Sequence, residues 1–348
     1  METTENLLKD EQDKSCLFNI IIYTHEARRT AYFKEVAQKV RQQFPCHVIF
    51  IQRDLQDTKN DLNIHVTAQK DKNDQEFLGD QIFIEVSGEA IQRVPFLILP
   101  HLIPDLPIYC LWGQDFIEDD PLLSQLQHMA TRLIFDSEST VNLQKFSQAL
   151  LKRLNESRIP IVDMNWARIK GWRDVIGRTF DSPERLEQLR QAQEIVMTYN
   201  QIANPFFNEP DTQAIYIQAW LASSLNWTFQ GLTREGTDRV IFYQSSSSKI
   251  IIRLVLAQND EYDSEEVLTV EVKGPKDYLC CLTREGNDQV VVHACDAYAC
   301  QLPFHFVINA LQSGRSFIEE VFYQQISQHY AQMLQMISLA QWSENGKI

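Results

Sequence analysis

Short apolar runs alternate with amphipathic stretches over roughly the first 160 residues. Runs rich in β-branched and aromatic residues predict strands, and the longer stretches with a 3.6-residue period predict helices. The expected strands are 17–24, 46–54, 62–70, 81–88, 106–112 and 132–137, and the expected helices are 29–44, 121–130 and 140–156. This alternation is typical of an α/β domain with a mixed, partly parallel sheet. We place the domain at residues 16–160, after a flexible N-terminal segment at 1–15.

The pattern changes after residue 160, first to helices and then to strict alternation. Helical periodicity dominates 163–225, where Ser182 and Pro183 are the expected start of a helix that runs through EIVMTY. Five or six alternating runs between 226 and 300 predict an antiparallel sheet. A long helix at 314–340 is expected to cover one face of that sheet. Residues 161–348 are therefore predicted to form an α+β domain.

Two segments in the alternating region share a turn. GLTREGTDRV at 231–240 and CLTREGNDQV at 281–290 each hold a glycine in a short polar stretch between strands. Glycine adopts a positive φ at little cost, so both segments predict hairpin turns. The residues between the two segments do not match, so we expect no repeat architecture.

The net negative charge of the chain limits the classes of partner that it is expected to bind. The 348 residues carry a formal charge of −15 and a pI near 5, which opposes binding to phosphate backbones and anionic lipids. We therefore expect no nucleic-acid and no membrane partner. The polar, acidic N-terminus is unlike a secretory signal, and four prolines interrupt the most apolar stretch, 94–112. The predicted location is the cytoplasm.

Motifs for catalysis and cofactor binding are missing from the sequence. Only 11 glycines are present, and none are arranged as in the dinucleotide, Walker A or kinase loops, which need glycine for close approach of phosphate. No H-E-x-x-H motif and no pair of C-x-x-C motifs occurs. The expectation is a protein without cofactor, metal site or catalytic residues.

Seven cysteines are present, and four of them lie late in the chain: Cys280, Cys281, Cys295 and Cys300. On a continuous strand the last two would be roughly 16 Å apart, at about 3.3 Å per residue. A turn at Asp296 could bring them within disulfide reach. Three interpretations are open: structural thiols, a redox-responsive pair, or a metal site that includes His293.

The segment VDMNWARIKGWRDVIGRTFD, at 162–181, combines aromatic and basic side chains. If Asp163 caps one helix here, the apolar side chains form a single buried stripe. Arg173 then projects into that stripe, where it could stack on an indole or pair with a carboxylate. The pairing could lock this chain together or dock a partner. The stripe consists of Trp166, Ile169, Ile176 and Phe180, with Trp172 at its margin, while Arg168, Lys170 and Arg178 point elsewhere.

The second unusual segment is LIPDLPIYCLWG, at 102–113. Its prolines impose an extended approach to a buried strand. Asp105 and Trp112 then either set strand register or form part of a recognition surface.

These two segments, together with FPCHVIFI and AWLASSLNW, resemble the glucose-6-phosphate dehydrogenase assembly protein family, OpcA. The resemblance implies a non-catalytic protein that binds glucose-6-phosphate dehydrogenase in the oxidative pentose phosphate pathway. It also implies allosteric activation, with the active oligomer of the dehydrogenase favoured by binding. Asp105, Trp112, Trp166, Arg168, Trp172 and Arg173 are the candidate partner-binding residues. The family is linked to thioredoxin-dependent control through cysteines, which makes thioredoxin a further candidate partner. Cys280, Cys281, Cys295 and Cys300 are the candidate redox residues from their clustering in this sequence, and the resemblance matches none of them individually to the family's cysteines.

The alternative function is of a different class. Arg168 and Arg173 could clamp a small anion such as a sugar phosphate, in a binding protein or an enzyme. The sequence shows no general base or nucleophile beside these arginines, so we rank this alternative second.

Overall fold

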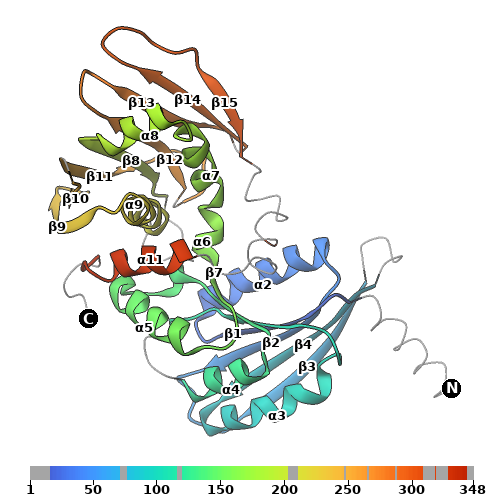
Figure 1. The fold of residues 1–348 in the computed structure, drawn as a ribbon. Coiled ribbons are helices and arrows are strands. Elements are labelled where there is room, and N and C mark those ends of the chain that lie inside the picture. The colour runs from blue at the N-terminus through green and yellow to red at the C-terminus, as the bar shows by residue number, and fades with distance from the viewer. Residues whose placement is uncertain are drawn as a thin grey trace. The chain divides into compact units, whose positions relative to one another are not determined.

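The computed structural model describes most of the chain. The described residues are 16–70, 77–115, 120–202, 211–246, 248–264, 266–286, 288–308, 318 and 328–342. For 67–70 and 77–80 only the backbone is described. They form two compact units. Each unit is built on one sheet (Figure 1).

The first sheet has seven strands in the order β3-β4-β2-β1-β5-β6-β7. All neighbouring strands are parallel except β3, which pairs antiparallel with β4 at one edge. The mixed, partly parallel sheet predicted from the sequence is therefore confirmed, and it is mostly parallel. The strands are β1 (Asn19–Thr24), β2 (His47–Asp54), β3 (Leu62–Lys70), β4 (Phe77–Ser87), β5 (Ile108–Trp112), β6 (Arg132–Phe135) and β7 (Ile161–Asp163).

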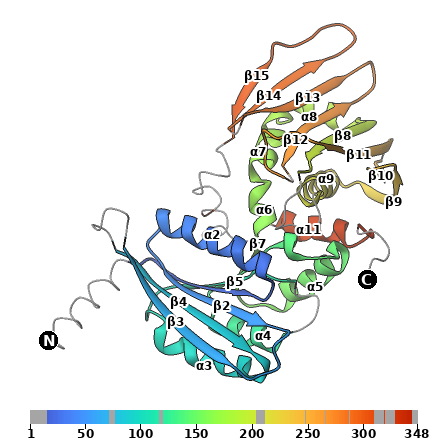
Figure 2. The same cartoon turned by 180° about the vertical axis from the view of Figure 1, so that it is seen from behind.

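Without β3, the order of this sheet is that of the doubly wound Rossmann fold, in which the chain reverses direction of winding between two central strands. That reversal lies here between β1 and β5. Every residue of β1 is buried, as expected for a parallel strand covered on both faces. Helix α2 (Ala27–Gln43) lies on one face of the sheet, and α3 (Val94–Ile98) and α4 (Pro121–Met129) lie on the other (Figures 1 and 2).

The sheet extends past residue 160, the predicted end of the first domain. β7 pairs with β6 through Leu133 and Ile161, so residues 161–163 complete the first sheet. Helix α5 (Leu143–Glu156) connects β6 to β7 in the chain. By its contacts, most of α5 belongs to the second unit.

The second sheet has eight strands in the order β15-β14-β13-β12-β8-β11-β10-β9. The alternating runs between 226 and 300 all form strands, β9 to β14, as predicted. The sheet is mixed, because β8 is parallel to β11 while the other neighbours are antiparallel. The strands are β8 (Glu194–Asn200), β9 (Thr228–Glu235), β10 (Asp238–Gln244), β11 (Lys249–Ala257), β12 (Val267–Lys273), β13 (Leu279–Glu285), β14 (Gln289–Cys295) and β15 (Phe304–Val307).

The prediction of a helix through EIVMTY is wrong. Helix α8 (Pro183–Arg190) starts as expected, with Ser182 Oγ accepting a hydrogen bond from Arg185 N at 3.3 Å. It ends at Arg190, and the following apolar run is the central strand β8. Its buried residues Ile195, Met197 and Tyr199 alternate with half-buried ones. A run this short is compatible with both the helical period of 3.6 and the strand period of two. Pairing with neighbouring strands in the sheet makes it a strand.

The expected single helix over 163–181 is also divided in two. α6 (Met164–Arg168) and α7 (Lys170–Thr179) are separated at Ile169, whose ψ of 2° interrupts the helix. Asp163 is the last residue of β7, and its Oδ1 accepts a hydrogen bond from Ser137 N at 3.1 Å. The stripe is nevertheless continuous across the break, since its apolar side chains are all buried.

The last two helices pack against each other. α9 (Thr212–Ser224) is buried around most of its circumference, and α11 (Gln328–Ile337) packs mainly on it and not on the sheet. Of the predicted helix at 314–340, the structure describes a helix over Gln328–Ile337, and 338–340 are not helical. Residues 314–317 and 319–327 lie outside the described residues, so a single long helix over the sheet stays a prediction. Among the described residues, no helix combines the length and apolar character needed to span a membrane.

Candidate functional site

The cationic aromatic cluster of α6 and α7 is one of two candidate sites. The Arg173 guanidinium carbon lies 3.6 Å from the centroid of the Trp166 ring. Arg173 Nη2 also donates a hydrogen bond to the Trp166 carbonyl oxygen at 3.0 Å. A guanidinium stacked on an indole at this distance is a cation–π contact, which holds the side chain in one place. The stacking on an indole that was considered from the sequence is present within this chain.

The tryptophans of this cluster are core residues. Trp166 and Trp172 are 4% and 3% exposed, and the Trp166 ring lies 5.4 Å from the Tyr330 ring of α11. Gly171 lies against Ile308, because a Cβ at this glycine would be 2.5 Å from Ile308 Cγ2. The apolar side of α6 and α7 is therefore occupied by this chain.

The polar side of α6 and α7 is accessible. Lys170 Nζ and Asp174 Oδ2 form an ion pair at 2.6 Å, and Arg168 Nη1 donates to Asn165 Oδ1 at 3.0 Å. Arg178 is exposed in the last turn of α7. We call Arg168, Lys170 and Arg178 the basic rim.

Asp105 and Trp112 occupy different environments in the first unit. Asp105 is exposed in a turn and has a φ of 63°. Trp112 is 2% exposed at the end of β5 and stacks on Tyr23 with centroids 4.0 Å apart. Its indole is part of the core, whereas the carboxylate of Asp105 faces solvent. The predicted site residues therefore belong to two units, with Asp105 and Trp112 in the first and the α6–α7 group in the second.

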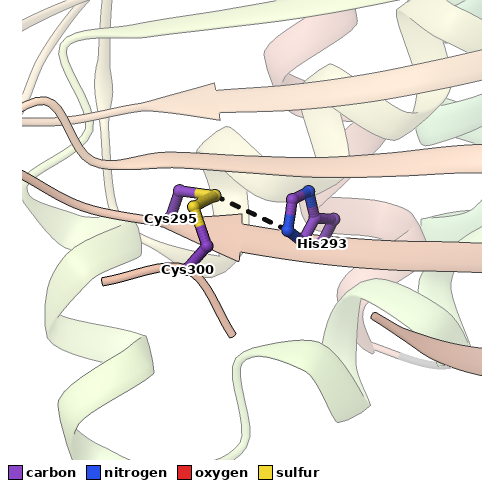
Figure 3. A group of neighbouring side chains, drawn as sticks. All are labelled: His293, Cys295 and Cys300. Atoms are coloured by element: carbon purple, nitrogen blue, oxygen red, sulfur yellow. Dashed lines mark hydrogen bonds between the residues drawn. A yellow bond between two sulfur atoms is a disulfide. The ribbon is translucent and has the colours of Figure 1, made fainter. Parts of the chain in front are cut away.

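The second candidate site is a disulfide between Cys295 and Cys300 (Figure 3). Asp296 makes the turn that joins them: its Oδ1 accepts hydrogen bonds from Tyr298 N at 2.8 Å and Ala299 N at 3.0 Å. These two bonds hold the pKa of the Asp296 carboxyl below its usual range. The turn anticipated at Asp296 is confirmed, and it brings the two Cα atoms to 4.1 Å.

The disulfide loop lines a cavity of about 280 Å³. Asp296 and Tyr298 contribute from the loop, Gln188 and Gln191 from the end of α8, and Lys276 and Tyr278 from the turn before β13. Ala297 N donates to the Lys276 carbonyl at 3.1 Å. The position of the loop therefore determines the shape of this cavity.

His293 completes the group drawn in Figure 3. Its Nε2 is 3.6 Å from Cys295 Sγ, and the three ligand atoms lie within 4.8 Å of one another. Metal ligation needs cysteine thiolates. Both sulfurs are joined in the disulfide, so in this state the group offers a metal only the imidazole.

The other two late cysteines are not paired. Cys280 and Cys281 are adjacent on β13 and face opposite sides of the sheet, as predicted for neighbours on a strand. Burial raises the pKa of the Cys280 thiol to about 11 and also raises that of Cys281. A raised pKa makes a thiol a poor nucleophile at neutral pH.

The sequence reasoning missed two buried ion pairs. Arg29 pairs with Asp136 in the first unit and Arg239 with Asp211 in the second, and all four side chains are almost inaccessible. Once the strand order is known, one feature of the sequence points to the first pair: two arginines lie in the segment HEARRT after the first strand, where a dinucleotide-binding fold would carry glycines.

The fold defines a class: a doubly wound α/β unit joined to a second unit built on a mixed sheet. A solved structure with this fold is KijD10, a 3-ketoreductase from Actinomadura kijaniata in complex with TDP-benzene and NADP. It is 9% identical, the TM-score is 0.52, and the match covers 92% of this chain and 94% of that one. At such low identity the likeness concerns the fold alone.

The family is given by two models described as glucose-6-phosphate dehydrogenase subunit N-terminal domain and C-terminal domain, which match residues 37–155 and 159–298. The chain belongs to this family, OpcA, as the resemblance indicated.

Two relatives carry the name "Putative OxPP cycle protein OpcA". The protein from Nostoc punctiforme is 25% identical over 206 residues, which are 58% of this chain and 43% of the relative. The protein from Synechocystis sp. is 24% identical over 196 residues, 56% of this chain and 40% of the relative. The chain thus matches less than half of the length of these relatives.

Proposed function

We propose that this protein is a non-catalytic assembly factor that binds glucose-6-phosphate dehydrogenase in the pentose phosphate pathway and favours its active oligomer. The observation that carries the proposal is the match of both halves of the chain to the subunit family models. The names of the relatives place them in the oxidative pentose phosphate cycle. A binding protein activates only if it binds the active state of its partner more tightly than the inactive state.

The basic rim is the part of the predicted partner-binding region that we assign to the contact. Trp166 and Trp172 are buried, so they hold the two helices in place, and Arg173 is stacked on Trp166. Arg178, exposed in the last turn of α7, can reach a carboxylate of a partner without unpacking the core. Asp105, exposed in the first unit, remains a candidate contact on independent grounds.

The test combines activity and oligomer size. Glucose-6-phosphate dehydrogenase is assayed with and without an excess of this protein, and the mass of the dehydrogenase is measured by light scattering. We expect a higher rate and a shift toward the active oligomer. If the maximal rate, the half-saturating substrate concentration and the mass all stay unchanged, the proposal is wrong.

A charge reversal tests the surface separately. Arg178→Glu is expected to weaken binding by about tenfold, because it places like charge at the contact. Arg93→Glu, an equally exposed arginine of the first unit, serves as the matched control and should bind normally. Equal affinity of both variants would move the contact away from the basic rim while leaving the proposed function intact.

We further propose that the Cys295–Cys300 disulfide makes this activity redox-dependent. A dithiol reductant such as thioredoxin attacks one sulfur, forms a mixed disulfide and leaves as its own disulfide, so two electrons convert the pair to two thiols. The site is open to such attack, since Cys300 is exposed and Cys295 half-buried. Reduction would release the loop that lines the cavity.

The redox proposal is tested with a Cys295→Ser/Cys300→Ser double variant. Dehydrogenase activation by the wild type should change on reduction, and the double variant should match the reduced wild type under both conditions. Cys281→Ser is the control, because Cys281 is a half-buried unpaired thiol on the same sheet, and it should respond like the wild type. A redox response that persists in the double variant would assign it to another residue.

The anion clamp that we ranked second finds little support in the geometry. Arg173 already uses one face for Trp166 and Nη2 for its carbonyl, and Arg168 donates to Asn165. A sugar phosphate would have to displace these contacts. A thermal-shift titration with sugar phosphates separates the two functions, since only a clamp predicts a saturable rise in melting temperature.

A further inference from the structure

The carboxyl edge of the first sheet is where this fold class binds dinucleotides. In a doubly wound sheet the ligand lies in the crevice at the point where the winding reverses, with its pyrophosphate against the turn after the first strand. That point is between β1 and β5 here. The residues at this edge can therefore be tested for their fit to a nicotinamide dinucleotide.

The turn after β1 does not fit a pyrophosphate. The segment from His25 to Thr30 reads HEARRT, enters α2 at Ala27 and holds none of the glycines that let phosphate approach the backbone. Glu26 is the N-cap residue of α2, and its carboxylate accepts a hydrogen bond from Arg28 Nε at 2.7 Å, so an acidic residue stands at the helix start near which the fold would hold a phosphate. Thr30 Oγ1 is 2.8 Å from Thr24 Oγ1, which ties the first turn of α2 to the end of β1.

The Arg29 side chain lies across the crevice between the ends of β1 and β5, in the place where related folds hold a ligand. Its side chain, 1% exposed, extends from α2 over the ends of β5 and β6. Nη2 donates to the carboxylate of Asp136, the residue after β6, and Nε donates to the carbonyl of Gly113, the residue after β5, at 3.4 Å. The guanidinium also lies over the Phe33 ring, 4.9 Å from its centroid. Two strand ends and a helix are thus joined by one side chain.

Aromatic side chains fill the remaining space. Phe33 packs on the backbone of Gly113 so closely that a Cβ there would be 2.4 Å from the ring. Tyr23 and Trp112, adjacent on β1 and β5, stack on each other and are 1% and 2% exposed. These three rings therefore occupy the space beside the ends of β1 and β5, where the nicotinamide and the pyrophosphate would lie.

We infer that the buried Arg29–Asp136 pair closes the dinucleotide crevice of this fold and converts the first unit into a rigid module that does not bind NAD(P). The residues and the implied cofactor disagree in three ways: the segment after β1 lacks glycine, an acidic residue stands at the N-cap position of α2, and Arg29 lies across the crevice. This inference concerns the first unit and is independent of the partner proposed above.

Binding is tested directly on the full-length protein. NADP⁺, NADPH, NAD⁺ and NADH are titrated to about 1 mM by calorimetry and by thermal shift; a site with a Kd of ~10 μM would be about 99% filled there. We expect no saturable heat and no rise in melting temperature. Saturable binding of any of the four that is lost in Arg29→Met would make Arg29 a ligand and overturn the inference.

The closing role of the pair is tested by a double-mutant cycle. Arg29→Met and Asp136→Leu each leave a buried charge without its partner, and each is expected to lower the melting temperature by about 10 °C. The double variant replaces both charges with apolar groups and should recover at least half of the larger loss. Additive losses would show that the two side chains do not act as a pair and would also overturn the inference.

Chemical modification gives an independent measure in the wild type. An arginine reagent followed by mass spectrometry should modify Arg28, whose side chain is 38% exposed, and spare the neighbouring Arg29. Equal modification of both would show that the crevice opens in solution, against the inference.

Discussion

The two sheets place their charged side chains in different positions. The first is covered on both faces, its central strand β1 is wholly buried, and its ion pair Arg29–Asp136 lies at the strand ends. In the second, burial alternates along the strands. Its less buried face carries a charge ladder across strands, in which Glu194 accepts from Arg253 at 2.8 Å and Lys273 at 2.9 Å.

The difference follows from what each sheet must cover. A sheet with helices on both faces can accommodate ionised groups only at its edges. The carboxyl edge, which binds ligands in related folds, can therefore hold an internal ion pair such as Arg29–Asp136. A sheet with a more open face can carry charges directly over the strands, where water screens them. Removal of one charge should therefore have very different costs in the two settings.

The largest effect is expected at the second unit's own buried pair. Asp211→Ala leaves the 5% exposed Arg239 charged and without this partner, and should reduce the free energy of unfolding by about 3–5 kcal/mol. Asp211 is the N-cap residue of α9 but makes no side-chain capping bond, so capping does not contribute. Urea unfolding of the purified protein measures the loss.

The control for this prediction is an apolar replacement of both partners. Arg239→Met/Asp211→Leu removes both charges together and should be much less destabilised than Asp211→Ala. If Asp211→Ala costs no more than about 1 kcal/mol, the pair behaves like a surface pair and the contrast between buried and exposed charges fails.

A second, intermediate effect compares two glycines of α7. Gly171→Ala should destabilise by about 1–2 kcal/mol, because its Cβ would overlap Ile308. Gly177→Ala should stabilise by about 0.5–1 kcal/mol, because no atom lies within 4 Å and alanine restricts the unfolded chain. Thermal unfolding of the two variants should shift in opposite directions.

The cost at Gly171 can be assigned to its neighbour. In an Ile308→Ala background the Cγ2 atom is absent, so Gly171→Ala should cost less than it does in the wild type. An unchanged cost would mean that the helix backbone, and not the packing against Ile308, requires glycine at this position.

The success of the sequence predictions followed the strength of local signals. The turn glycines Gly236 and Gly286 have φ values of 65° and 64°, as their sequence context predicted. Strands β9 to β14 were found because one face is buried and the period of two is clear. β8 was missed because its partners β11 and β12 lie more than 50 residues further along the chain, and no local pattern reports such pairing.

The candidate site was predictable to the same extent. The buried stripe through Trp166 and the turn at Asp296 follow from spacing within one segment, and both were found. The contact between Arg29 and Asp136 joins residues 107 positions apart, so composition and periodicity carry no information about it. Only the strand order shows that the segment HEARRT lies at the edge of the sheet where related folds bind a ligand.

The smallest predicted effect is at the charge ladder, and its pH dependence has a definite sign. Hydrogen bonds from Lys273, and then from Arg253, hold the pKa of the Glu194 carboxyl below its usual value. A lowered folded-state pKa stabilises the protein above the unfolded pKa of about 4.3, and this stabilisation is lost as the pH falls through the folded value. Because the ladder is partly exposed, Glu194→Gln should lower the free energy of unfolding by at most about 1 kcal/mol at pH 7, and by less in high salt.

Urea unfolding at a series of pH values measures this effect. The urea midpoints of wild type and variant should differ by a constant amount above about pH 6 and converge below about pH 4. If the difference in urea midpoint grew on acidification, the charge ladder would destabilise the protein at neutral pH, opposite to this prediction. If Glu194→Gln lowered the free energy of unfolding by more than about 3 kcal/mol, a charge pair on the more open sheet face would be worth as much as a buried pair.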